Sequence, residues 1–151
     1  LQLMSTYTQI IYHVIFTTKN REKNLLEVNQ KRLYRFIWQT IENKNCKVFQ
    51  INGMEDHMHL AIFLHPSISL SDLVKDIKVS SNYWIRREKI FPNFKSWQIG
   101  YGAFSYSIKE LPRVVRYIKN QKEHHRKKTY IEESIKLLED NGVKYDEAFL
   151  F

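Results

Sequence analysis

The chain has 151 residues, of which 43% are hydrophobic and only 4 are Gly and 3 Pro, so long disorder is excluded and one compact domain is expected. Its net charge of +8 favours nucleic acid or another polyanion as a partner, although a solvated basic surface accounts for the charge equally well. The lone cysteine excludes a disulfide framework and a cysteine-based zinc cluster, and no stretch reaches the ~18 apolar residues of a membrane span.

We expect this single domain to extend from Met4 to Phe151. Met4 resembles a natural start, so residues 1–3 are interpreted as upstream or expression-derived and are left out of the fold prediction. The N-terminus has no secretory pattern, and the lone Cys46 suits a reducing compartment. Together these features predict a protein of the cytoplasm.

The first half of the chain alternates strand and helix patterns. Residues 8–17 are rich in β-branched and aromatic side chains, which is typical of a buried strand. Apolar residues at helical spacing predict a helix over about 27–43. A second strand is expected over 48–51, followed by a turn at Asn52-Gly53 or by a loop that extends to Asp56.

The second half continues this order. Ser69 is expected to cap a helix, Pro112 suits the first turn of another, and Asn141-Gly142 ends the last. The predicted elements are a strand over 57–64, a helix over about 70–89, a strand over 97–105, a helix from Pro112 to about His124 and a helix over about 130–140. The order is β-α-β-β-α-β plus C-terminal helices, which predicts an α+β, ferredoxin-like antiparallel sheet. One face of such a sheet is free of the two crossover helices and can hold a site.

The first candidate site residues are His57 and His59, at the start of the predicted third strand. Residues two apart in a strand point to the same face, so both rings would aim at one point and could share a metal ion, while Met58 faces the core. A His-x-His pair is weak evidence by itself. The alternative is two half-exposed strand histidines without a shared ligand.

The second candidate pair is Tyr117 and Gln121, which are stacked neighbours at i and i+4 on a helix. They lie at the edge of an apolar stripe, where the ring of a tyrosine can pack against apolar residues while its hydroxyl contacts water. A boundary tyrosine beside a surface amide is the plainer alternative.

The two pairs together resemble the signature of the single-tyrosine HUH transposases, in which U is a hydrophobic residue. This family contains bacterial insertion-sequence transposases and their REP-associated relatives. The resemblance covers nearly the whole chain, from the strand around residues 12–16 to the third helix, and includes the segment 97–105. It implies that His57, His59 and Gln121 are metal ligands and that Tyr117 is the nucleophile.

The resemblance also implies magnesium or manganese as the metal, single-stranded DNA hairpins as the substrate, and a homodimer in which the tyrosine helix can complete either subunit's site. Ligand softness alone favours zinc, cobalt or manganese over magnesium, so the prediction of magnesium depends on the family resemblance. The expected reaction is cleavage and strand transfer through a 5′-phosphotyrosine intermediate. A phenol with a pKa of about 10 needs a nearby cation or base to attack at neutral pH.

Basic residues on two predicted helices are candidates for phosphate contacts, which give affinity but little sequence information. They are Lys75, Lys78, Arg86, Arg113, Arg116 and Lys119. A solvated charged face is the alternative for each cluster. His13 is expected to be a core residue that could lie near the site, and His124 and His125 are interpreted as solvated residues at a helix end. Tyr101, Phe104 and Tyr106 could stack on bases, although core packing is more frequent for such residues.

Three other functions compete with a DNA strand transferase. A host-domesticated, REP-associated endonuclease would nick palindromic repeats without mobilising its own gene. A non-catalytic nucleic-acid-binding domain of the same fold would bind hairpins regardless of Tyr117→Phe or a chelator. A histidine-ligated metal hydrolase would release product without a covalent protein–DNA adduct.

Overall fold

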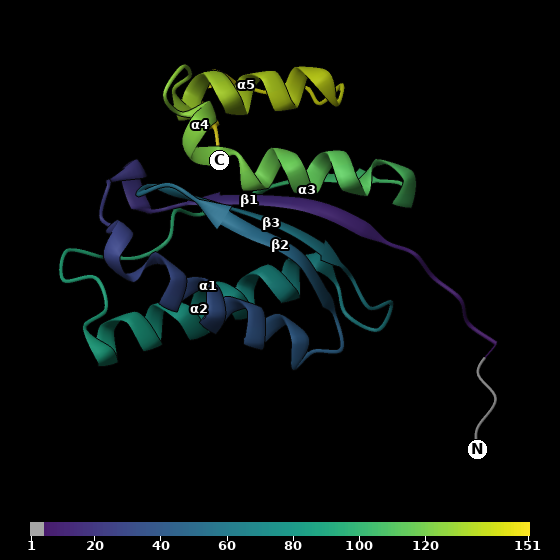
Figure 1. The fold of residues 1–151 in the computed structure, drawn as a ribbon, viewed down its shortest axis with the longest axis horizontal. Coiled ribbons are helices and arrows are strands. Elements are labelled where there is room, and N and C mark those ends of the chain that lie inside the picture. Colours follow the sequence, from purple (N-terminus) through teal and green to yellow (C-terminus); the bar gives the residue numbers. More distant parts are fainter. Residues whose placement is uncertain (1–4) are drawn as a thin grey trace.

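A four-stranded antiparallel sheet forms the centre of the fold, in the strand order β2-β3-β1-β4 (Figure 1). Its strands are β1 (Ile11–Thr17), β2 (Lys47–Gly53), β3 (His57–Phe63) and β4 (Gly102–Tyr106). The order is that of the ferredoxin-like arrangement, so the predicted fold class is confirmed. The computed structural model describes residues 5–151, and residues 1–3, interpreted as additional, lie outside this range.

Two crossover helices, α1 (Glu27–Glu42) and α2 (Leu70–Glu88), pack against one face of the sheet (Figure 1). The main core lies between them and the sheet and includes Val14, Phe16, Leu33, Ile37, Met58, Leu60, Ile62, Leu73 and Ile77. Ser69 caps α2 as predicted, because its Oγ accepts a hydrogen bond from the Asp72 backbone N–H at 3.1 Å. Within residues 5–151, none of the helices is both long enough and apolar enough to cross a membrane.

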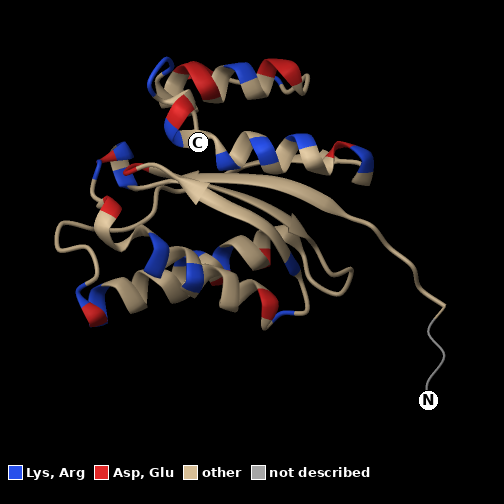
Figure 2. Cartoon of the chain, viewed as in Figure 1, with Lys and Arg blue, Asp and Glu red and all other residues tan. Residues whose placement is uncertain are grey.

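The C-terminal helices cover the opposite face of the sheet (Figure 1). They are α3 (Leu111–Lys119), α4 (Gln121–His124) and α5 (Tyr130–Asp140), and three single turns of 3-10 helix, η1 (Lys19–Arg21), η2 (Ile108–Glu110) and η3 (Glu147–Phe149), complete the structure. Figure 2 shows the charged residues gathered on helices and loops, while the four strands carry a single one, Lys47. Charged groups near this sheet therefore come almost entirely from the helices and loops.

The fourth strand is shorter than the sequence predicts. Trp97 forms only an isolated bridge with Thr18, and regular pairing resumes at Gly102. Between them Gly100 has a φ of +93°, and the carbonyls of Gln98 and Gly100 accept hydrogen bonds from Lys78 Nζ at 2.8 and 2.5 Å. The segment therefore turns towards α2 instead of extending the sheet.

The third predicted helix is interrupted at Asn120, where φ is −93° and ψ is 19°. Asn52, predicted as a turn residue, lies in β2, and its Nδ2 donates to the carbonyls of Ile118 at 2.9 Å and Lys119 at 3.1 Å. Because this side chain satisfies the last carbonyls of α3, the chain can change direction there. The interruption lets α4 rise from the sheet towards α5 (Figure 1).

Candidate active site

His57 and His59 lie on the sheet face covered by α3, α4 and α5. Strand alternation places Met58 between them in the core on the opposite face. Both imidazoles have 0% exposure, and their ring centroids are 5.1 Å apart. The structure thus brings the two rings together on one face of the sheet. Both rings are fully buried, unlike the half-exposed strand histidines of the alternative interpretation.

Each of these rings has a partner for its Nδ1 atom. Asp56 Oδ1 lies 2.6 Å from His57 Nδ1, and His13 Nε2, from β1, lies 2.7 Å from His59 Nδ1. His13 is therefore more than the core residue favoured from the sequence, because it fixes the orientation of His59. With Nδ1 engaged, the Nε2 atom of each ring is directed towards residues of the C-terminal helices.

Gln121 enters the same cluster from the first residue of α4. The interruption at Asn120 turns its side chain inwards, where it is fully buried. Its Oε1 lies 3.2 Å from His57 Nε2, and its Nε2 donates to Glu133 at 3.0 Å. Sequence reasoning placed Gln121 one regular helical turn beyond Tyr117, whereas the contact depends on the end of α3.

A carboxylate from α5 occupies the centre of the cluster. Glu133 Oε1 lies 3.0 Å from His59 Nε2, 3.5 Å from His57 Nε2 and 3.2 Å from His125 Nε2. Glu133 Oε2 accepts hydrogen bonds from Gln121 and from the hydroxyl of Tyr117. One side chain thereby links three histidines, the amide and the phenol.

Glu133 was not among the predicted site residues, and the prediction of a solvated helix-end residue is wrong for His125. His125, interpreted as solvated, has a side chain only 8% exposed, and its Nε2 lies 3.1 Å from Gln121 Oε1. His124 packs on Tyr117 with 4.7 Å between ring centroids. These contacts arise because α4 and the start of α5 fold back over the sheet.

One signal in the sequence could have identified Glu133. The buried side chains of α5 are Tyr130, Glu133, Ser134 and Leu138, so a charged residue lies within the core-facing stripe. Its position in the first turn, after the capping residue Thr129, is also where an acidic residue is favourable near any helix N-terminus.

Burial governs the ionisation of the histidines. It lowers the pKa of His13 well below its usual value and the pKa of His59 to about 4, so both rings are neutral at neutral pH. Burial opposes the charged form of His57 too, but hydrogen bonds to Asp56 and Glu133 raise its pKa to about 9. The pKa of Glu133 is far below its usual range, because hydrogen bonds from the histidines outweigh its burial.

Tyr117 reaches this cluster from α3 and is half-buried. Burial, followed by the negative charge of Glu133, raises the pKa of its phenol well above the usual value. A cavity of about 360 Å³ lies beside it, with His13, Tyr106, Arg113 and Lys136 among its lining residues. The phenol is therefore protonated in the metal-free chain and lies against a cavity whose basic residues, Arg113 and Lys136, are paired with the acidic residues Glu110 and Asp140.

Several donor atoms of the cluster have the spacing of neighbouring ligands around one cation. His57 Nε2, His59 Nε2, Gln121 Oε1 and Glu133 Oε1 are separated by 3.0 to 3.5 Å along their contacts. Bonds of ~2.1 Å to one ion would separate neighbouring ligands by about 3.0–3.4 Å. The group of ligand atoms that all lie within 4.8 Å of one another comprises those of His57, His125 and Glu133, and His59 is not part of it. The set combines imidazole nitrogens with two oxygen donors.

The six basic residues considered for DNA do not form one surface. Lys75, Lys78 and Arg86 are on α2, and Arg113, Arg116 and Lys119 are on α3, so the sheet separates the two groups. Arg113 pairs with Glu110 at 3.3 Å and lines the cavity beside Tyr117. Of the aromatic residues considered for stacking, Phe104 is buried, whereas Tyr101 and Tyr106 are partly exposed.

The fold is similar to those of several solved structures. A candidate transposase from Deinococcus radiodurans R1 superposes with a TM-score of 0.61 and 21% identity, over 80% of this chain and 97% of that one. A REP-associated tyrosine transposase bound to a REP hairpin gives a TM-score of 0.59 and 16% identity, over 83% of this chain and 74% of that one. At these identities the likeness concerns the fold alone. No curated protein matches the sequence.

The sequence model of one family, described as "Transposase IS200 like", matches residues 6–121. The match includes His57, His59, Tyr117 and Gln121, and ends before His125 and Glu133. It covers well over half of the 151 residues. The chain therefore belongs to the IS200-like transposase family.

Proposed function

We propose that the chain is a metal-dependent tyrosine transposase that cleaves and rejoins single-stranded DNA at hairpin-bearing ends. The observation that supports this most directly is one carboxylate, Glu133, which contacts the hydroxyl of Tyr117, the Nε2 atoms of His57 and His59 and the amide nitrogen of Gln121. A nucleophile and a set of metal donors thus lie next to each other within one chain. The REP hairpin bound by the similar transposase supports a hairpin substrate.

In the proposed step, the Tyr117 oxygen forms a bond to the phosphorus of a phosphodiester while the bond from phosphorus to the 3′ oxygen breaks. The phenolic proton is released to solvent, and the departing 3′ oxygen takes up a proton from solvent. The products are a 5′-phosphotyrosine and a free 3′-hydroxyl. Attack by the 3′-hydroxyl of another strand reverses the exchange and joins DNA without ATP.

His57, His59 and Gln121 would hold a magnesium or manganese ion, with Glu133 as a fourth protein ligand. Such an ion supplies a positive charge that stabilises the transition state of the phosphodiester. The oxygen donors of Gln121 and Glu133 suit these hard cations better than imidazole alone. Asp56 and His13 orient the two histidines through their Nδ1 atoms.

Basic residues on α3 would hold the DNA backbone close to Tyr117. Arg113 lines the cavity beside the phenol, and Arg116 and Lys119 are exposed on the same helix. The homodimer remains a proposal from the family. In this chain Tyr117 contacts Glu133 of its own subunit, which supports a reaction centre assembled within one subunit.

The test is an adduct assay. The protein is incubated with a labelled single-stranded DNA hairpin and manganese or magnesium, and a denaturation-resistant protein–DNA adduct is sought. We expect an adduct that disappears in Tyr117→Phe, in His57→Ala and with EDTA. Tyr106→Phe is a matched control, because its ring lies 6.5 Å from that of His13 near the same cavity, and this variant should still form the adduct.

An adduct that survives Tyr117→Phe would assign the nucleophile to another residue and refute the proposal. A non-catalytic binding domain would be favoured if the wild type forms no adduct and if hairpin affinity is unchanged by Tyr117→Phe and by EDTA. Cleavage without any adduct would favour a metal hydrolase.

A further inference from the structure

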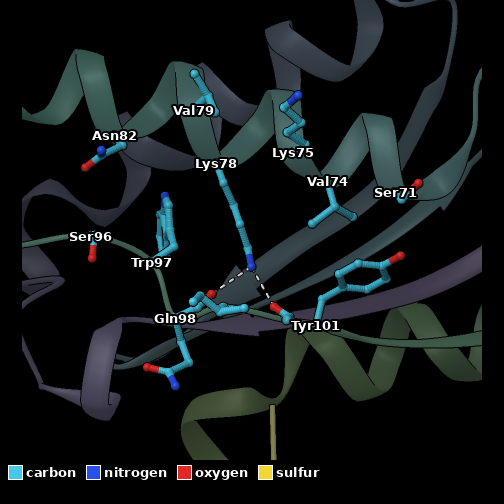
Figure 3. Close-up of a pocket in the computed structure, with 12 residues that line it drawn as sticks. Ser71, Val74, Lys75, Lys78, Val79, Asn82, Ser96, Trp97, Gln98 and Tyr101 are labelled. Carbon is cyan, nitrogen blue, oxygen red and sulfur yellow. Dashed lines mark hydrogen bonds between the residues drawn. The ribbon is translucent and has the colours of Figure 1, made fainter.

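A groove remote from the reaction centre lies between α2 and the segment that leads into β4 (Figure 3). Its volume is about 400 Å³, which is within the range of small-ligand sites, roughly 300–1,000 Å³. The walls are mainly apolar and include Val74, Val79, Trp97, Ile99 and Tyr101. Lys75 and Lys78 also line it, and among the described residues of the lining none is acidic.

The groove combines a fixed floor with uncovered apolar walls. Trp97 is buried, and its Nε1 donates to Ser81 Oγ at 2.9 Å, so the indole is held in place. Ile99 is 94% exposed and Val79 is 62% exposed. One such residue on a surface is ordinary, but two at the mouth of one hollow form a patch that a ligand can cover.

Lys78 brings a positive charge into this apolar setting. Figure 3 shows its side chain extending from α2 between Trp97 and Tyr101 to the backbone carbonyls of residues 98 and 100. Its ammonium group also lies 5.7 Å from the centre of the Phe16 ring. An ammonium group has three donors, so one is left for an anionic ligand. Lys75, one turn earlier on α2, adds a second, exposed cation.

We propose that this groove binds one unpaired nucleotide of the DNA substrate, with its base against Tyr101 and Ile99 and its phosphate near Lys75 and Lys78. An aromatic wall beside cations is the arrangement that holds single-stranded nucleic acid, because every base has a flat apolar face and a neighbouring phosphate. The proposal rests on the proposed function only in taking single-stranded DNA as the substrate.

The sheet register connects the groove with the reaction centre. Ile15 of β1 pairs with His59 on one side and with Gly102 on the other. The segment that lines the groove therefore enters the sheet at Gly102, level with His59. The two positions are two strands apart, which is about 10 Å at the usual strand spacing. A DNA strand that crosses the β4 edge could place one base in the groove and a phosphodiester at Tyr117. The groove would then determine which phosphate is presented for cleavage.

The test uses Tyr117→Phe protein in EDTA, so that no chemistry occurs. Its affinity is measured by fluorescence anisotropy for a DNA hairpin with a single-stranded extension, and for a series in which one extension nucleotide at a time is abasic. We expect one abasic position to weaken binding by about tenfold, which is typical of a lost stacked base. Adding Tyr101→Ala should weaken binding of the intact DNA similarly and abolish the sensitivity to that position.

Three further variants separate loss of the site from loss of the fold. Ile99→Asp places a negative charge on a fully solvated side chain and should also weaken binding, whereas Val28→Asp, on a residue 83% exposed on α1, should not. Tyr83→Ala is the matched aromatic control on α2, because this residue is 65% exposed and lies outside the groove.

The proposal is overturned if single-stranded DNA binds but no abasic position is coupled to Tyr101. It is equally overturned if Ile99→Asp leaves DNA affinity unchanged and instead alters the sedimentation coefficient, since the groove would then be an interface between copies of the chain. Coupling to Tyr101 in a protein that forms no adduct would support the groove and refute the proposed chemistry.

Discussion

The carboxylate of Glu133 accepts a hydrogen bond from the hydroxyl of Tyr117. Glu133 is on α5 and Tyr117 on α3, and the same carboxylate also contacts the buried histidines of β3. The proposed nucleophile is thus tied to the proposed metal donors by a single side chain. In the metal-free chain burial, followed by the negative charge of this side chain, raises the pKa of the phenol and keeps it protonated.

Replacing Glu133 should change both the ionisation of Tyr117 and the affinity of the site for a metal ion, and each can be measured separately. In Glu133→Gln we expect the pKa of Tyr117 to fall, because the neighbouring negative charge is removed, and affinity for manganese to drop by about 10- to 100-fold. Ultraviolet difference titration against Tyr117→Phe reports the phenol, and calorimetry reports the metal. Glu132→Gln, at the exposed neighbouring position, should change neither quantity. Unchanged metal affinity in Glu133→Gln would exclude Glu133 as a ligand.

Metal binding should depend on pH through His57. The pKa of this ring is raised to about 9, so at pH 7 the metal-free chain carries a proton on His57 that the ion must displace. Affinity should therefore rise by up to about tenfold per pH unit towards pH 9, with about one proton released per ion at pH 7. Calorimetry in buffers of different ionisation enthalpy counts that proton. Affinity that does not change between pH 6 and 8 would contradict the assignment.

Asn52→Ala should disturb the site from the end of α3. The substitution leaves the carbonyls of Ile118 and Lys119 without their side-chain donor and should lower the free energy of unfolding by about 1–2 kcal/mol. Gln121 directly follows Asn120, where α3 ends. A shift of this helix end would move the Gln121 side chain, so affinity for manganese should fall as well. Asn141→Ala removes a similar bond, to the carbonyl of Leu137 at 2.8 Å, and should lower stability without affecting the metal. Equal metal affinities in both variants would show that Asn52 does not position Gln121.

Gly53→Ala should move the backbone that carries His57. A Cβ at this glycine would lie 2.2 Å from the carbonyl oxygen of His57, so the start of β3 must shift. We expect a loss of about 1–3 kcal/mol in the free energy of unfolding, measured by urea denaturation, together with weaker metal binding. Normal stability and metal affinity in this variant would mean that β2 and β3 adjust without disturbing the histidine.

The sequence predicted the order of the elements and the alternation of His57 and His59 about Met58, because periodicity is a local property of the chain. It could not predict the end of α3 at Asn120, since that depends on Asn52, a residue distant in the sequence. Glu133 was missed for a related reason. Its buried position follows from the docking of α5 on the sheet, while its place in the first helical turn has an ordinary local explanation.

His13, His124 and His125 show the same limit. Each was assigned from its own segment, as a core residue or a solvated helix end, and each has its decisive partner elsewhere: His59 for His13, Tyr117 for His124 and Glu133 for His125. Lys78 was grouped with basic residues for DNA on charge alone. Its two bonds to backbone carbonyls exist only because the segment before β4 turns towards α2.

Tyr117 meets Glu133 within one polypeptide, and this has a kinetic consequence. A catalytic centre built from two subunits is lost on dilution, because the subunits separate. Here the fraction of molecules with an assembled centre should be independent of protein concentration, and adduct formation per molecule should stay constant from micromolar down to nanomolar protein when DNA is saturating. Joining two DNA ends held by separate copies would be the concentration-dependent stage.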